Sequence, residues 1–370
     1  MKRLIYIFFL FALLSCDKEG SSMRVGKPMQ FSVLAPDVST RSEVTDEGIR
    51  NDDPVYVYGT SSDGSSTSTI FLPPGTARLS YDGTTHVWKP IQIQYSAGSG
   101  QVIDVLWDPA GKKHYQFYGY AYSSEAQLDA DPGFVIGAEA AGRQFTVYQP
   151  ESATWSAAAN VDGSGTLDYL LSYLVDVPPP STKNYPLVKL QLEHAMAKVE
   201  VDVQIARAMI GKIKNISLQF RGISRAATML CIQPKLDNEK GTNSWIVNLM
   251  DPKATYTATD IVCSESNLTE GEGLISPDIS FLAVPVNNSQ MDGYKLTLNY
   301  YDEQASLTGD PTYEYEFDLK NFSPDGWMSG HRIRYVLKID NSIHLSGYIV
   351  DFEDVDYLEG VMLPDIPGTK

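Results

Sequence analysis

The chain has 370 residues, a formal net charge of −17 at pH 7 and a sequence pI near 4.7. This length is enough for two domains of ordinary size. The acidic balance excludes nucleic-acid binding from the expected functions, because a phosphate backbone is bound by clusters of Lys and Arg that this chain lacks.

The first sixteen residues predict an export signal. Two basic residues precede an unbroken apolar run at 4–14, which is too short for an ordinary membrane-spanning helix. The run ends in Leu-Leu-Ser-Cys, which resembles the lipobox of bacterial lipoproteins. We therefore expect residues 1–16 to be a lipoprotein signal, Cys16 to be lipidated and residues 17–24 to form a tether. The alternative is an ordinary cleaved signal that happens to contain a cysteine.

Period-two alternation of apolar and polar residues predicts antiparallel strands along most of the chain. An aromatic run at 115–122 is expected to be a strand with both faces covered. Apolar residues alternate with polar ones at 199–205, 313–319 and 333–339, as expected for strands with one face on a core. Helical spacing is scarce, and its best instance is one or two turns at 167–174.

Three prolines and a polar stretch at 178–184 predict a linker, because prolines cannot donate to a sheet and favour a stiff extended chain. We therefore expect the following units: an N-terminal β-sandwich at 25–180, a C-terminal β-sandwich at 186–356 and a C-terminal tail at 357–370.

A change of register is expected just after this linker. The apolar residues of 188–192 occupy even positions, whereas those from Val199 onward occupy odd positions. The intervening segment at 193–198 must therefore contain a bulge or a turn. We expect His194, which lies in it, to make a structural hydrogen bond rather than to act as a catalyst.

Two cysteines remain once Cys16 is lipidated, namely Cys231 and Cys263. In an oxidising envelope they can form a disulfide that stabilises the fold by about 3 kcal/mol or more. The alternative is two buried free thiols.

No enzyme motif occurs in the sequence. It lacks His-Glu-x-x-His, Gly-x-Ser-x-Gly, Walker and dinucleotide-binding patterns, and its five histidines lie too far apart for local metal spacing. The segments at 162–166 and 302–303 look superficially like calcium loops but lack the repeated oxygen ligands and the closing glutamate of an EF-hand. We expect no catalytic residue, no metal and no cofactor.

Several short segments occur in a characteristic order: the Leu-Leu-Ser-Cys ending, Thr40-Arg41 after a first strand at 30–35, the run at 55–58, Trp88, the aromatic strand, and the segments at 167–171, 281–285 and 330–335. The most specific is Leu-x-Leu-x-His-Ala-x-Ala-Lys-Val at 190–199. Together they cover most of the chain and resemble the fimbrillin family of Bacteroidales, the type V pilins and their relatives.

The resemblance implies an all-β fold of two tandem transthyretin-like antiparallel β-sandwich domains. It also implies a structural or adhesive protein that is lipid-anchored at the cell outer membrane, on the surface or in a fimbrium. The implied partners are other fimbrial subunits, outer-membrane lipid through the N-terminal acyl anchor, and host or bacterial surface ligands. No catalysis is implied.

The family's assembly mechanism implies roles for particular residues. Related pilins are cut after an arginine, which removes the first strand and leaves a groove for a strand of a neighbouring subunit. Here the expected residues are the processing site Arg41, the removable strand with Phe31, Val33 and Ala35, and the candidate donor strand with Ile343, Leu345 and Ile349. The alternative is that all these strands complete their own sandwich and Arg41 is an ordinary loop residue.

A second class of function stays open from the sequence. Exposed Trp and Tyr side chains of a solitary lipid-anchored surface protein can stack on sugars, so that the chain would bind glycans or host ligands. A β-sandwich can equally use all of these aromatic residues in its cores.

Overall fold

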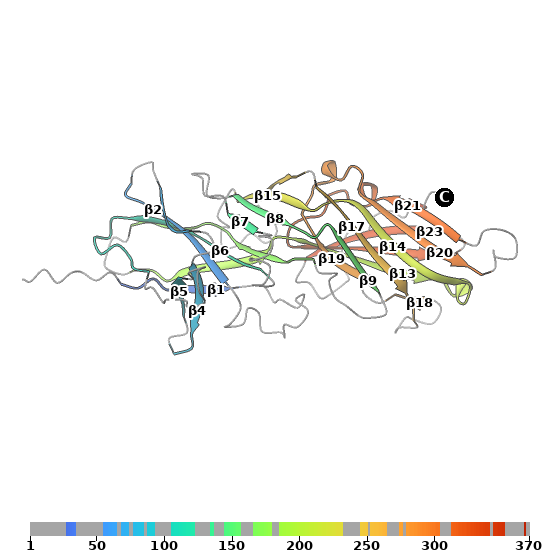
Figure 1. Ribbon diagram of the computed structural model, residues 1–370, viewed down its shortest axis with the longest axis horizontal. Coiled ribbons are helices and arrows are strands. Elements are labelled where there is room, and N and C mark those ends of the chain that lie inside the picture. The colour runs from blue at the N-terminus through green and yellow to red at the C-terminus, as the bar shows by residue number, and fades with distance from the viewer. Residues whose placement is uncertain are drawn as a thin grey trace, which may run out of the picture.

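The computed structural model describes residues 27–34, 55–64, 68–73, 77–84, 87–92, 105–122, 134–136, 144–156, 166–179, 185–231, 245–250, 252–264, 274–276, 279–303, 312–340, 343–351 and 366–367. The regular structure in this part of the chain is almost entirely strand, with short 3-10 turns at η2 (Arg207–Met209), η3 (Asn288–Gln290) and η5 (Leu319–Phe322). The predicted all-β fold is therefore confirmed. The molecule is elongated, with an N-terminal and a C-terminal half along its long axis (Figure 1).

The N-terminal half is built on one nine-stranded sheet. Its members are β1 (Phe31–Leu34), β2 (Val55–Ser62), β3 (Thr69–Leu72), β4 (Ala77–Asp82), β5 (Val87–Gln92), β6 (His114–Tyr122), β10 (Tyr169–Ser172), β11 (Val175–Val177) and β12 (Val188–His194). They follow the order β11-β6-β10-β12-β1-β5-β4-β2-β3, and β6 also pairs with β2. This last pairing closes the sheet, so that β6, β10, β12, β1, β5, β4 and β2 form a ring.

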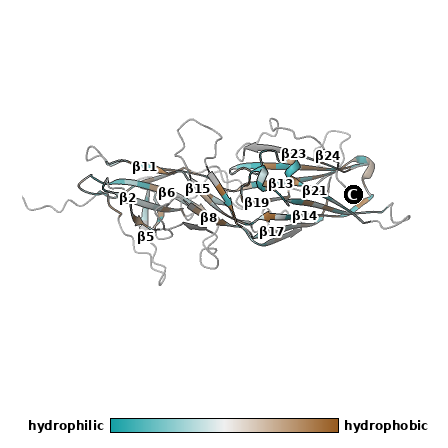
Figure 2. Cartoon of the chain, turned by 90° about the horizontal axis from the view of Figure 1, so that it is seen from above, coloured by the Kyte–Doolittle hydropathy of each residue, from teal (hydrophilic) through white to brown (hydrophobic). Residues whose placement is uncertain are grey.

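The C-terminal half contains two sheets. The six-stranded sheet has the path β18 (Leu274–Ile275), β13 (Ala197–Ile205), β22 (His331–Ile339), β23 (Ile343–Asp351) and β24 (Ile366–Pro367), with β19 (Ile279–Ala283) paired to β13. The five-stranded sheet has the order β21 (Thr312–Asp318), β20 (Lys295–Asp302), β14 (Ile213–Ser224), β17 (Lys253–Ile261) and β9 (Ser152–Ser156). Seen from above, the two sheets form separate layers, with β13 and β23 over β14 and β17 (Figure 2).

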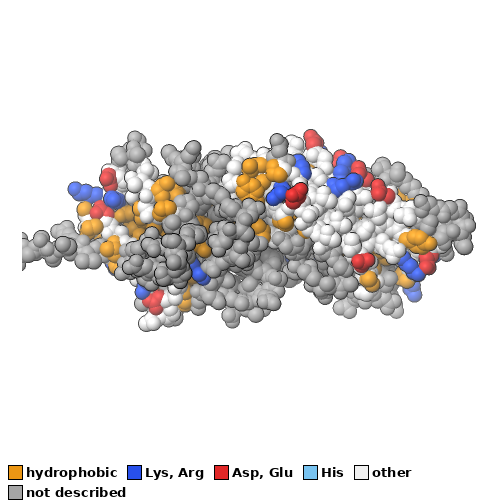
Figure 3. Space-filling model, viewed as in Figure 1, with side chains coloured by type: hydrophobic (Ala, Val, Ile, Leu, Met, Phe, Trp, Pro, Cys, Tyr) orange, Lys and Arg blue, Asp and Glu red, His pale blue; other side chains and the backbone are white. Residues whose placement is uncertain are grey.

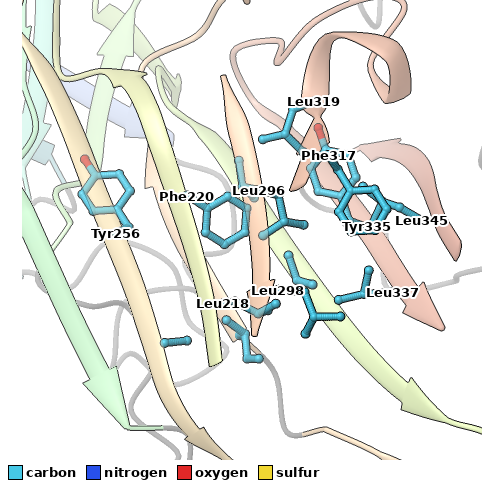
Figure 4. Packing of buried hydrophobic residues seen from close by; sticks show 14 of the residues in the cluster. Leu218, Phe220, Tyr256, Leu296, Leu298, Phe317, Leu319, Tyr335, Leu337 and Leu345 are labelled. Atoms are coloured by element: carbon cyan, nitrogen blue, oxygen red, sulfur yellow. The ribbon is translucent and has the colours of Figure 1, made fainter. Parts of the chain in front are cut away.

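The core of the C-terminal half lies between these two layers. Leu218, Phe220 and Leu296 from the five-stranded sheet point toward Tyr335 and Leu345 from the six-stranded sheet (Figure 4). All five side chains are fully buried, with 0% of their surface exposed to solvent. This arrangement follows from the alternation in sequence, because each strand turns one row of apolar side chains to the opposite sheet.

A four-stranded sheet lies between the two halves. Its order is β16 (Trp245–Leu249), β15 (Ala226–Cys231), β8 (Gln144–Tyr148) and β7 (Phe134–Ile136). Phe145 and Met229 of this sheet pack in one cluster with Tyr118 and Tyr120 of β6. The opposite face of β6 supplies Phe117 to the interior of the ring, so the aromatic strand has both faces covered, as predicted.

Two strands pair across the predicted domain boundary at 180–186. β12 follows the proline segment in sequence but pairs with β1 and β10 of the N-terminal sheet. β9 precedes it but pairs in parallel with β17 of the C-terminal sheet. Pro178 and Pro179 are exposed, the strands on both sides of the proline segment belong to the N-terminal half, and the change of half occurs after β12. Whether either half is a transthyretin-like domain stays a prediction.

The helical interpretation of residues 167–174 is wrong, because this segment contains strand β10. All four of its residues are buried: Leu170 packs inside the ring, whereas Tyr169 and Leu171 pack in the cluster between the halves. A strand that is covered on both faces needs no polar alternation, and its run of apolar residues is therefore compatible with helical spacing as well.

Candidate functional site

Strand β1 contains two of the residues that were expected to form the removable strand, and it is one of the strands of the ring. Its four residues pair in parallel with β12, from Phe31 opposite Val188 to Leu34 opposite Gln191. On its other side it pairs with β5 at one position only, where Phe31 lies opposite Trp88. β1 is thus an interior strand of the sheet although it is the first described strand in sequence.

The residues just before β1 are bound by a second segment, at 105–107. The Met29 amide donates to the Val105 carbonyl at 2.7 Å, and the Trp107 amide donates to the Lys27 carbonyl at 2.9 Å. A further bond runs from the Val188 amide to the Gln30 carbonyl at 3.0 Å. Together with the ladder to β12, these bonds fix the register of the whole segment 27–34.

The inward side chains of this segment fill the ring. Met29 and Phe31 are 1% and 0% exposed, and Val33 is half-buried against the same cluster. The Phe31 ring meets Phe117 of β6 edge to face, with centroids 5.5 Å apart. Phe31 and Val33 therefore face the core on alternate positions, as predicted for the removable strand, while Ala35 lies outside the described residues.

The segment at 105–113 is held in place by its own contacts with the protein. Trp107 is 1% exposed and stacks on Tyr185 with ring centroids 5.6 Å apart. Backbone amides of Ala110 and Lys112 donate to the Asp108 carboxylate, and the bond from Lys112 lowers the pKa of that carboxyl most. The Asp108 amide donates to the Tyr115 hydroxyl at 2.9 Å, and burial raises the pKa of Tyr115.

The candidate donor residues belong to a strand of the C-terminal half. Ile343 and Leu345 lie in β23, which pairs with β22 at nine consecutive positions and with β24 at two. Their side chains are 3% and 0% exposed in the C-terminal core, and the backbone of Ile349 lies opposite Ile333. In this structure β23 is thus an integral strand of its own sheet, and a donor role for it stays a prediction. The alternation of apolar and polar residues predicted correctly which face of this strand is buried. It could not say whether that face packs in the core of the same chain or in the groove of a neighbouring subunit.

The crossing between the halves lies where the register change was expected. β12 ends at His194 and β13 begins at Ala197, and both residues between them are buried. His194 Nδ1 lies 2.9 Å from the Asp168 carboxylate, with both side chains almost fully buried, and the Ser329 hydroxyl donates to the His194 carbonyl at 3.1 Å. His194 is therefore structural, and Asp168 is the partner that sequence reasoning missed.

The remaining predicted sites are tested only in part. Cys16 and Arg41 lie outside the described residues, so lipidation and processing stay predictions. Cys263 carries a half-buried thiol that donates to the Val203 carbonyl at 3.6 Å, and burial raises the pKa of this thiol to about 12. The side chain of Cys231 lies outside the described set, so its pairing with Cys263 is untested.

Within the described ranges, no three side chains of His, Cys, Asp and Glu gather closely enough to hold a metal ion. In the same part of the chain, no helix has the length and apolar character needed to span a membrane.

No family model matches the chain, and no curated protein matches its sequence. Its structural neighbours are candidate adhesion and fimbrial proteins of Bacteroidales at low identity. A candidate cell adhesion protein from Bacteroides ovatus is 12% identical, with a TM-score of 0.49, over 90% of this chain and 99% of that one. The fimbrial anchor protein Mfa2 from Porphyromonas gingivalis is 14% identical, with a TM-score of 0.33, over 88% and 98%. A fimbrial assembly protein from Parabacteroides distasonis is 12% identical, with a TM-score of 0.38, over 93% and 99%.

Proposed function

We propose that the chain is a structural or adhesive cell-surface lipoprotein that is exported with an acyl anchor on Cys16. Cleavage at Arg41 would release this anchor together with β1, and a strand of a neighbouring fimbrial subunit would take the place of β1. One observation carries the proposal: β1 is the first described strand in sequence but an interior strand of a closed ring. A single cut after this strand frees it from the rest of the ring, whereas release of any later ring strand would need a cut on each side of it.

Loss of β1 would create a groove with a defined chemistry. β12 would lose its parallel partner along Phe31–Leu34, and its backbone groups would stand unpaired. Phe117 and Trp88 would lose the side chain of Phe31 that covers them. An unpaired edge beside an apolar trough is the site that an added strand fills, by main-chain bonds and alternating side chains.

The described strands support a receiving role. Every one of them is paired within the chain's own sheets, and β23, the expected donor, is buried in the C-terminal core. The strand that would fill the groove must then come from another chain or from residues outside the described set. This favours a subunit at the end of a fimbrium over one that both gives and receives a described strand.

The first prediction tests the groove. Limited digestion with an arginine-specific protease should cut at Arg41, and β1 should stay bound until dilute denaturant releases it. The trimmed protein should then bind a labelled peptide that copies residues 27–36, as measured by fluorescence polarisation, because the peptide restores both the ladder to β12 and the buried Phe31. The uncut protein should not bind it.

Two peptide variants make this test specific. Phe31→Asp places a charge inside the ring and should weaken binding at least a hundredfold. Ser32→Asp changes the half-buried position on the opposite face and should bind within about threefold of the native peptide. Equal binding of the two variants, or no binding of the native peptide, contradicts strand replacement at this site.

The second prediction concerns the tether. Cys16→Ala should abolish incorporation of a labelled fatty acid in cells, because the thiol that would carry the acyl chains is gone. Cys263→Ala is the matched control and should incorporate the label as the native protein does. Label that persists in Cys16→Ala would show that the chain is not lipidated at this residue.

The glycan-binding alternative rests only on half-buried tyrosines of the described surface, such as Tyr313 and Tyr315, which stack on the buried Tyr300. The large apolar side chains that stand exposed there are Leu, Ile, Met and Val, which do not offer a flat ring to a sugar. The Trp and Tyr residues at the centre of the described clusters are in the cores instead.

A further inference from the structure

Exposed apolar side chains reach the surface in several places (Figure 3). Among the described residues, six large ones are exposed, and three of these lie on β1 or on a segment bonded to it. They are Leu34, Leu106 and Leu187, with 57%, 39% and 41% of their surface exposed. The other three, Ile210, Met250 and Val262, belong to segments away from β1. Half of the exposed apolar side chains therefore gather around one short strand.

The three leucines share the outer face of the ring. Met29 and Phe31 point inward, so the even positions of the segment, Pro28 and Leu34 among them, point outward. Pro28 forms a β-bridge with Leu106, whose neighbour Trp107 is the buried residue on that segment. Pro28 and Leu106 thus lie side by side on the outside.

Leu187 adds to this face from the other side of β1. Val188 lies opposite Phe31 and points inward, so Leu187 and Lys189 on either side of it point outward. Both of these outward residues are exposed. We call the set Pro28, Leu34, Leu106, Leu187 and Lys189 the β1 outer face.

The charge of this face differs from that of the whole chain. Residues 27–34 and 185–192 contain no acidic residue, although the chain carries 46. They do contain Lys27 and Lys189, both exposed. An apolar surface bordered by lysines suits a phosphate-bearing lipid surface, because leucines enter the interface while ammonium groups meet the headgroup phosphates.

The position along the chain selects one lipid surface. Only residues 17–26 separate Cys16 from Lys27, where this face begins, and ten extended residues reach at most ~35 Å. We propose that the β1 outer face rests on the bilayer to which Cys16 is anchored. This inference rests on the lipid tether of the proposed function and applies to the uncut protein that retains β1.

The test uses the lipidated protein on vesicles of phosphatidylcholine and phosphatidylglycerol, with flotation as proof of anchoring. A membrane-impermeant reagent acetylates exposed lysines, and mass spectrometry gives the rate at each one. In the native protein, Lys189 should react at least threefold more slowly than in the double variant Leu106→Ser, Leu187→Ser, which no longer holds this face on the lipid. Lys338, an exposed lysine of the C-terminal half, should react equally in both.

Ile210→Ser is the matched control, because Ile210 is 40% exposed but lies away from β1. It should leave the rate at Lys189 unchanged. Equal rates at Lys189 in the native protein and the double variant overturn the proposal. Protection that grows with protein density on the vesicle assigns the face to a second copy and overturns it too. A native protein that does not float with the vesicles overturns the lipid tether itself. Flotation thus tests the tether separately from the lysine rates, which test the contact of the β1 outer face with the bilayer.

Discussion

Replacing Gly326 by alanine is expected to lower the free energy of unfolding by about 4 kcal/mol or more. Gly326 has a φ of +78°, and a Cβ placed there would lie 2.1 Å from the Val286 carbonyl oxygen. That oxygen accepts the Trp327 amide at 2.7 Å, and the Trp327 carbonyl accepts the Val286 amide at 2.8 Å. The methyl group would push these two segments apart and withdraw the fully buried Trp327, whose indole donates to Tyr335 at 2.8 Å.

Gly211→Ala is the matched control, because it measures the cost of backbone strain without the steric contact. Gly211 also has a φ of +78°, but a Cβ there would meet nothing within 4 Å. Its replacement should cost only about 1 kcal/mol, which is the cost of a left-handed conformation for alanine. Urea denaturation followed by far-UV circular dichroism measures both variants. A loss at Gly326 no larger than at Gly211 would mean that the two segments separate easily.

The second large effect is expected for Val201→Asp. Val201 is 1% exposed at the centre of β13, with Ile279 of β19 on one side and Tyr335 of β22 on the other. A carboxylate at this position would face the C-terminal core without a partner, and burying an unpaired charge is among the most destabilising single changes. We expect a loss of more than about 4 kcal/mol or a failure to accumulate folded protein.

Gln204→Asp introduces the same side chain on the opposite face of the same strand. Gln204 is half-buried, and its replacement should cost about 0.5 kcal/mol. Thermal unfolding of the two variants and of the native protein gives the comparison. Native-like stability of Val201→Asp together with a loss in Gln204→Asp would mean that β13 faces the other way.

The sequence predicted the faces of strands well, because a side chain's direction in a strand depends only on its position modulo two. Val199 and Ile333 are buried as expected, and the aromatic run is covered on both sides. Membership of a sheet depends instead on contacts between residues far apart in sequence, which alternation does not encode. This is why β9 and β12 were each expected in the wrong half.

In the candidate site, too, side-chain directions within a strand were predictable from the sequence, whereas contacts between distant segments were not. Phe31 and Val33 were identified as one apolar row, and Phe31 is fully buried. The bonds from residues 105–107 to the start of β1 come from an irregular segment, which has no period to recognise. Trp107 and the apolar residues directly before it were the signal there, since a Trp at the end of an apolar run is usually anchored in a core.

The pairing of β9 with β17, described above, has a mechanical consequence. The backbone enters the C-terminal half to form β9, returns to form β10 in the ring, and leaves it again after β12. A force that pulls the two halves apart is thus carried by several backbone passages rather than by one hinge. β9 and β17 run in parallel, so they would have to slide past each other, breaking several bonds at once. Such an interlaced joint resists separation of the two halves.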